Sequence, residues 1–124
     1  MLTAKPIQNK EEQKSACKLC SIPFRPEAFA YSQKENNEII AMSQFDILSD
    51  GGVILDLQMK DGLSDDIEAL FILGRAVLNF LDLSGIKSCS FNLNNKSGVY
   101  LPLILSLALF KILKSDSNFS VSPA

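Results

Sequence analysis

The sequence predicts a single α/β (α+β) domain in which helices flank a mixed, mostly antiparallel sheet. Two patterns predict this class. Residues 64–83 carry apolar side chains at three- and four-residue spacing, which is typical of a long helix that buries one face. Before them lie three strand-like segments separated by polar turns, as in an antiparallel meander. The chain has 124 residues, the length of one ordinary domain, so we expect residues 1–124 to form one domain.

Both helices in the first two thirds of the chain carry signals at their ends. A short helix is expected over residues 10–21, where Asn9 followed by Glu12 has the form of a capping box. The long helix is expected to start at an N-cap on Ser64. It should end before Gly85, because glycine is favoured just after the last helical residue.

The meander is expected to hold strands over residues 28–32, 39–48 and 53–59. A polar turn over residues 34–38 separates the first two. The run Ser49-Asp50-Gly51-Gly52 predicts a tight hairpin between the second and third, because glycine and aspartate tolerate positive φ. In the third strand one set of alternating residues is apolar and the other is mixed, which is typical of a half-buried antiparallel strand.

After the long helix, a strand is expected over residues 86–93, a second helix over residues 99–113 and a last short strand over residues 119–122. The 99–113 segment is intensely apolar, but it contains Pro102 and Lys111 and is shorter than the roughly 20 residues that a membrane span needs. We therefore expect a buried helix and no membrane partner. The expected order is α-β-β-β-α-β-α-β.

Composition excludes several classes of function. The formal net charge is −2, the pI is about 5.0 and the basic residues are scattered, so no nucleic-acid partner is expected. The chain has no histidine, which excludes Ser-His and Cys-His catalysis and removes the commonest metal ligand. The first residues lack the apolar core of a signal peptide, and the cysteines are few. These features indicate a reduced, cytoplasmic protein.

The pair Cys17-x-x-Cys20 has three interpretations: a redox motif, part of a zinc site, or two small buried side chains. A redox pair should lie at the start of a helix, where the helix dipole lowers the thiol pKa, but this pair lies at the end of the predicted one. A structural zinc site needs four ligands, and Cys89 is the only other thiol. We therefore expect no metal and favour buried side chains.

The expected order of elements resembles the GNAT acetyltransferase superfamily over about residues 29–122. The run Leu73–Leu78, Leu-Gly-Arg-Ala-Val-Leu, is similar to the end of that superfamily's cofactor motif. The turn over residues 84–87 and the Ala-Leu-Phe of residues 108–110, followed by the last strand, resemble later family features. The resemblance implies a sheet that splays around acetyl-CoA and transfers an acetyl group to a small-molecule amine.

Carried over by position, the resemblance assigns cofactor contacts to two parts of the chain. The main chain of Leu57, Gln58 and Met59 would hold the pantetheine arm of acetyl-CoA. Gly74 and Arg75 belong to the run that matches the cofactor motif, and the start of the long helix would hold the pyrophosphate.

The helix start itself has the wrong chemistry for a pyrophosphate. Phosphate binds there because free backbone N–H groups and the helix dipole favour an anion, and glycines allow close approach. Only Gly74 matches the family pattern, whereas Ala69 and Ile72 occupy two of its other positions. The loop and first turn, residues 60–68, carry several carboxylates, one lysine and only Gly62. These residues indicate a well-capped helix and a poor nucleotide site.

For catalysis, the resemblance suggests a base on or beside the meander strands. Candidates are Asp56, Glu38 and Asp46, of which Asp56 stands out because it interrupts an apolar strand; the alternative is a carboxylate on an exposed sheet face. Many family members have a tyrosine that acts as the catalytic acid at the position where this chain has Leu105. Tyr100 is the nearest substitute and becomes the candidate acid.

Three functions remain open from the sequence. The first is a GNAT-like N-acetyltransferase, in which Arg25 would either meet an anionic acceptor or be a surface residue. The second is a degenerate relative that serves as a non-catalytic binding or dimerisation module, with a homodimer among its expected assemblies. The third is an unrelated interaction domain with residues 101–109 facing a partner. A gap between strands 53–59 and 86–93 would favour a cofactor slot, and a continuous ladder would not.

Overall fold

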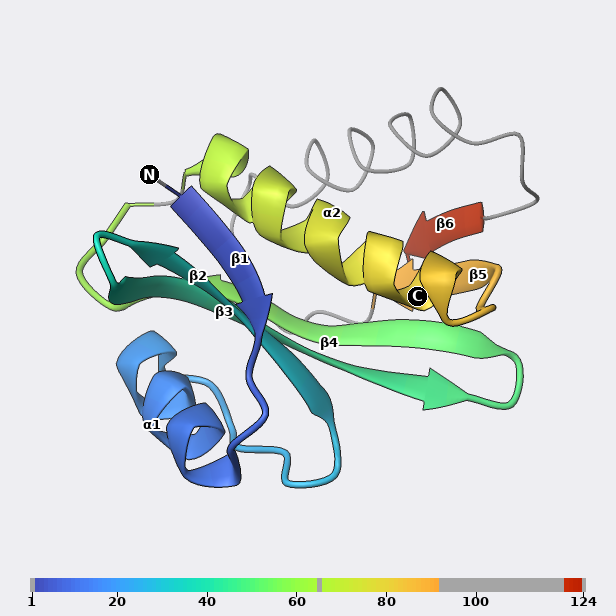
Figure 1. The fold of residues 1–124 in the computed structure, drawn as a ribbon, viewed down its shortest axis with the longest axis horizontal. Coiled ribbons are helices and arrows are strands. Elements are labelled where there is room, and N and C mark those ends of the chain that lie inside the picture. Colours follow the sequence, from blue (N-terminus) through green and yellow to red (C-terminus); the bar gives the residue numbers. More distant parts are fainter. Residues whose placement is uncertain (1, 65, 92–119, 124) are drawn as a thin grey trace.

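The computed structural model describes residues 2–64, 66–91 and 120–123. In chain order the elements are β1 (Leu2–Pro6), α1 (Lys10–Cys20), β2 (Phe29–Glu35), β3 (Glu38–Leu48), β4 (Gly51–Met59), α2 (Ile67–Leu83), β5 (Ser88–Phe91) and β6 (Ser120–Pro123). The strands lie side by side in this order as one six-stranded sheet (Figure 1). Strands β1 to β4 pair antiparallel, whereas β4–β5 and β5–β6 pair parallel. This confirms a mixed α+β fold with a mostly antiparallel sheet.

The chain begins with a strand, so the expected order, which starts with a helix, was wrong at this point. β1 is only five residues long, ends in Lys5 and Pro6, and lies at the edge of the sheet against β2. Lysine and proline are typical of edge strands, where they blunt the free edge, but they hide the alternation that identifies a strand. The predicted helix over residues 99–113 lies outside the described residues.

Short-range signals placed the turns correctly. Between β2 and β3, Asn36 and Asn37 adopt φ values of 53° and 69°, as a two-residue type I′ hairpin requires. Ser49 and Asp50 form the turn between β3 and β4, which confirms the predicted hairpin. Gly85 has a φ of +87° just after α2, the left-handed conformation expected of a glycine that ends a helix.

At the helix starts, one predicted cap is confirmed and one is wrong. Asn9 Oδ1 accepts hydrogen bonds from the amides of Glu11 and Glu12 at 2.7 and 3.2 Å, so Asn9 caps α1 as predicted. The long helix, α2, starts two residues later than expected, because Asp66 and not Ser64 is its cap.

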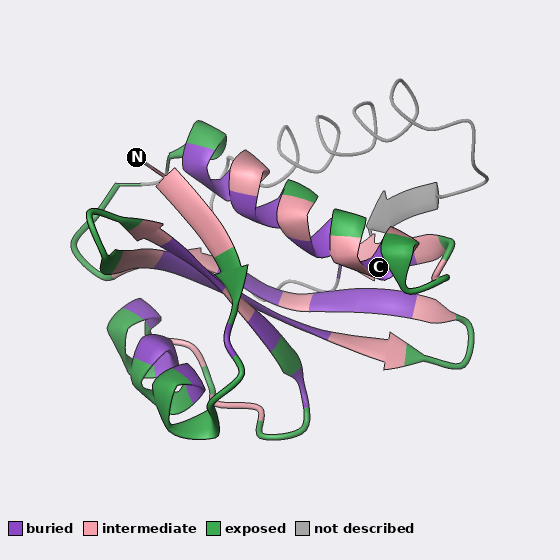
Figure 2. Ribbon diagram, viewed as in Figure 1, coloured by how far each residue is buried: buried purple, intermediate pink, exposed green. Residues whose placement is uncertain are grey.

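The two helices cover opposite faces of the sheet and define two apolar clusters (Figures 1 and 2). Under α2, buried residues of the helix pack on alternate residues of β3 and β4, including Ala41, Phe45 and Leu57. On the other face, Cys17 and Cys20 of α1 pack in one cluster with Met42 of β3. Burial on both faces explains why the central strands are apolar on one side and mixed on the other. Within the described part of the chain, no helix is long and apolar enough to cross a membrane.

Candidate functional site

Asp56 lies in the middle of β4, directly after an irregularity in the sheet. Gln44 of β3 pairs with Asp56, but the next residue, Phe45, pairs with Ile54, so Leu55 is an extra residue on β4. Such a β-bulge bends the strand and changes the direction of the side chains that follow it. The bulge therefore lets Ile54 face α2 while Asp56, two residues on, faces α1.

The carboxylate of Asp56 is buried and ion-paired. Its side chain is 7% exposed, so the alternative of a carboxylate on an exposed sheet face is wrong. Oδ2 of Asp56 lies 2.7 Å from Nε of Arg25, in the loop after α1, and accepts a second hydrogen bond of 2.7 Å from Nε2 of Gln44. The hydrogen bond to Asp56 raises the pKa of the Arg25 guanidinium. Arg25 is therefore neither free nor a simple surface residue.

Gln44, which is wholly buried, joins this pair to α1 and to the loop that follows it. Its Oε1 accepts hydrogen bonds from Gln13 Nε2 at 2.9 Å and from the Arg25 amide at 3.0 Å. Cys17 Sγ donates a third, at 3.3 Å. Nε2 of Gln44 also donates to the carbonyl of Pro23 at 2.8 Å. We call Gln13, Cys17, Arg25, Gln44 and Asp56 the polar network.

The polar network fixes α1 and the following loop on the sheet. Every polar side-chain atom of Gln44 is used within it, and one oxygen of the buried Asp56 carboxylate accepts hydrogen bonds from both Arg25 and Gln44. Asp56 is thus better suited to hold Arg25 in place than to deprotonate an amine. Sequence reasoning found Asp56 but missed Gln13 and Gln44. The available signal was Gln44 itself, an amide at a core position of a strand.

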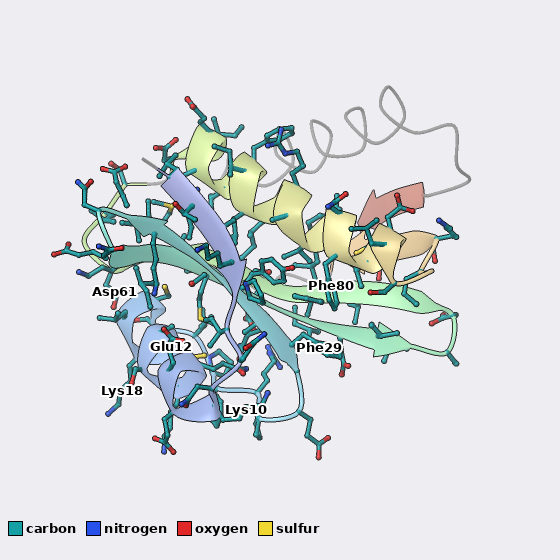
Figure 3. The ribbon with its side chains drawn as sticks, in the orientation of Figure 1. Lys10, Glu12, Lys18, Phe29, Asp61 and Phe80 are labelled. Carbon is teal, nitrogen blue, oxygen red and sulfur yellow. The ribbon has the colours of Figure 1, made fainter. Side chains whose placement is uncertain are left out.

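At the start of α2, the chain satisfies its own backbone donors. Asp66 Oδ1 accepts hydrogen bonds from the amides of Glu68 and Ala69 at 3.0 and 3.2 Å. Asp61 turns the other way and accepts a hydrogen bond from the Ser21 hydroxyl at the end of α1, where Figure 3 labels it. The Asp66 carboxylate thus occupies two of the first-turn amides at which the sequence resemblance leads us to expect a pyrophosphate.

The other predicted cofactor residues lie in two places. Leu57 and Met59 are buried in the core under α2, and Gln58 is half-buried on the other side of β4. Gly74 and Arg75 lie in the middle of α2, about two turns after Ile67. At that depth the amides belong to the helix's own hydrogen-bond ladder, so neither residue reaches the free N–H groups of the first turn.

Two predicted features, the gap between β4 and β5 and the candidate acid Tyr100, depend on residues 92–119. β5 pairs with β4 over Gly52–Ile54 and Cys89–Phe91, in parallel. The continuation of this pairing, on which the test for a cofactor gap depends, lies outside the described residues, as does Tyr100.

The three cysteines are buried and free. Burial, and to a lesser extent the Asp56 carboxylate, raises the pKa of Cys17 to about 11. Burial raises the pKa of Cys20 and of Cys89 to about 12. Because the thiolate is the reactive form, these pKa values favour buried side chains over a redox pair. Among residues 2–64, 66–91 and 120–123, no group of three or more Cys, Asp or Glu could hold a metal ion.

These thiols predict a loss of stability in alkali. Their unfolded pKa is near 9.0 and their folded pKa is higher, so the unfolded state releases protons first as the pH rises above 9. The free energy of unfolding should therefore be fully maintained below about pH 8 and fall as pH rises further. Between about pH 8 and 9.5 we expect a loss of roughly 2 kcal/mol for the three thiols together.

Urea denaturation at the two pH values measures this loss. The matched control is the double variant Cys20→Ala, Cys89→Ala, which should lose distinctly less stability over the same interval, whatever its stability at neutral pH. Equal losses in the two proteins would show that other groups cause the alkaline instability.

No model of a known protein family matches the chain, and no curated protein sequence matches it.

Proposed function

We propose that this chain is a GNAT-like domain that acts as a non-catalytic binding module and does not transfer acetyl groups from acetyl-CoA. One observation carries the proposal. Asp66 Oδ1 accepts hydrogen bonds from two amides in the first turn of α2, those of Glu68 and Ala69. N–H groups that would meet a pyrophosphate are therefore already bonded within the chain. A bound pyrophosphate would have to displace this carboxylate and lie beside it, and the two anions would repel each other.

The order of elements supports the GNAT-like scaffold. An antiparallel meander leads into a long covering helix, and the next strand returns parallel to β4. A strand, a helix and a parallel return strand form the ordinary βαβ crossover. The order of elements therefore supports the scaffold alone and does not imply binding of acetyl-CoA.

The second candidate is an N-acetyltransferase that acts on a small-molecule amine. It is favoured by the position of the buried Asp56 in β4, directly before Leu57–Met59, the segment expected to hold the cofactor. In that function Asp56 would be the base, Tyr100 the acid, and the β4 main chain would hold acetyl-CoA. The ion pair with Arg25 at 2.7 Å weighs against this role, because Arg25 and Gln44 both bind Oδ2 of this buried carboxylate and so keep that oxygen away from an amine.

Isothermal titration calorimetry with acetyl-CoA tests the choice. For the native chain we expect no measurable heat at about millimolar cofactor, because repulsion and the occupied amides both oppose binding. The informative variant is Asp66→Ser, which keeps a capping oxygen and removes the charge. Any weak binding of acetyl-CoA should be detected at a lower cofactor concentration for this variant than for the native chain.

Micromolar binding to the native chain would contradict the proposal, particularly if Arg75→Ala weakened it and if the protein then acetylated a primary amine. Sedimentation of the native chain over a range of concentrations tests whether the binding partner is a second copy.

A further inference from the structure

A cavity of about 380 Å³ lies at the β1 edge of the sheet, on the same face as α1. Strands β1 and β2, the start of α1 and the Asn36–Asn37 turn line it. None of its lining residues belongs to the polar network or to the start of α2. Its volume is at the lower end of the range for small-molecule sites.

Cross-strand pairing brings four polar side chains together in this cavity. Lys5 is paired with Ser32, and Thr3 with Lys34, so all four lie on one face of the β1–β2 ladder. Ser32 lines the cavity, although the residue is only 2% exposed. A hydroxyl that lines a cavity can donate a hydrogen bond to a ligand there.

The charges around the cavity favour an anion. Among the described residues of the lining, Lys5 and Lys34 oppose one carboxylate, Glu12, which leaves one excess positive charge although the whole chain has a net charge of −2. Lys34 Nζ lies 3.6 Å from Glu12 Oε2, and both side chains are more than a third exposed. An exposed pair at this distance is weak, so Lys34 is available to a competing anion.

We propose that this cavity binds a small organic phosphate. Lysine binds phosphate well as a point charge, and a phosphate monoester offers three acceptor oxygens to several donors at once. The hydroxyls of Thr3 and Ser32 and the amides of Asn36 and Asn37 add neutral donors around the two ammonium groups. A phosphate alone would leave part of the cavity empty, and a short polar body attached to it would fill the rest.

Isothermal titration calorimetry of the full chain with glycerol 3-phosphate at low salt tests this site. Lys34→Gln should weaken binding about tenfold, because it removes a charge-assisted hydrogen bond. Ser32→Ala should weaken it by a smaller factor. Glu12→Gln should tighten binding several-fold, because it removes the one carboxylate that the described residues contribute to the lining and so frees Lys34.

The control is Lys18→Gln, which makes the same change in charge on the exposed side of α1 (Figure 3). It should leave the affinity unchanged. Circular dichroism of each variant verifies the fold. The proposal fails if binding does not saturate, if Lys18→Gln weakens it as much as Lys34→Gln, or if Glu12→Gln does not tighten it. Inorganic phosphate should bind more weakly than glycerol 3-phosphate, and equal affinity would exclude an organic ligand.

Discussion

Replacing Gln44 by methionine is expected to lower the free energy of unfolding by about 3–5 kcal/mol, whereas the same replacement at Gln33 is expected to raise it by about 1–2 kcal/mol. Both glutamines are wholly buried, and both lie on the sheet, on β3 and β2 respectively. Methionine has nearly the same length and volume as glutamine. The opposite signs therefore come from hydrogen bonding and not from packing.

At Gln44 the replacement breaks the centre of the polar network. Gln13 Nε2 and the Arg25 amide lose the acceptor that they share, and the Pro23 carbonyl loses its donor. Of the two described partners of its carboxylate, Asp56 keeps Arg25 and loses Gln44. Each buried polar group left without a partner costs about 1–3 kcal/mol, and the groups here lie too close together for water to replace Gln44 easily.

At Gln33 the replacement removes a cost. Neither its Oε1 nor its Nε2 has a hydrogen-bond partner in the described part of the chain. Its neighbours across the strands are Ala4 and Ala41, which leave room for a long side chain but offer it no polar group. An apolar side chain of similar shape should pack into the same space without the penalty of burying an unsatisfied amide.

Urea denaturation of the two single variants measures both effects. Similar changes at the two positions would contradict the assignment of Gln44 as the centre of a hydrogen-bonded network. The double variant should show the sum of the two effects, because the two side chains lie on opposite faces of the sheet.

Much of the fold could be predicted because its signals are local. The capping Asn9, the glycines of the β3–β4 hairpin and the apolar stripe of α2 each identify an element within a few residues of sequence. β1 escaped prediction because an edge strand needs no alternating apolar residues. Asp66 escaped prediction as the cap of α2 because the loop before the helix offers several capping residues, and only geometry selects one.

The candidate site was harder to predict, for a different physical reason. Asp56 could be singled out because a carboxylate interrupts an apolar strand. Its role depends on Arg25 and Gln44, which the fold brings to it from distant parts of the chain. A side chain such as Gln44, whose five hydrogen bonds join separate elements, carries no local signal beyond being polar where burial is expected.

Replacing Gly51 by alanine should destabilise the protein by about 3 kcal/mol or more. Gly51 begins β4 at a φ of +142°, a conformation that residues with a Cβ rarely adopt. A Cβ built there would lie 2.3 Å from Ser88 Oγ and 3.0 Å from the Ser88 carbonyl oxygen. Ser88 Oγ is itself hydrogen-bonded to the carbonyl of Asp50, so moving it breaks a link between the hairpin and β5.

Gly62→Ala is the matched control, because Gly62 also has a positive φ, +87°, but no atom of the described residues lies within 4 Å of the added Cβ. It should cost only the backbone strain, about 1–2 kcal/mol. The excess cost at Gly51, measured by urea denaturation, reports the contact between β4 and β5. Equal costs would show that β5 does not approach β4 closely in solution.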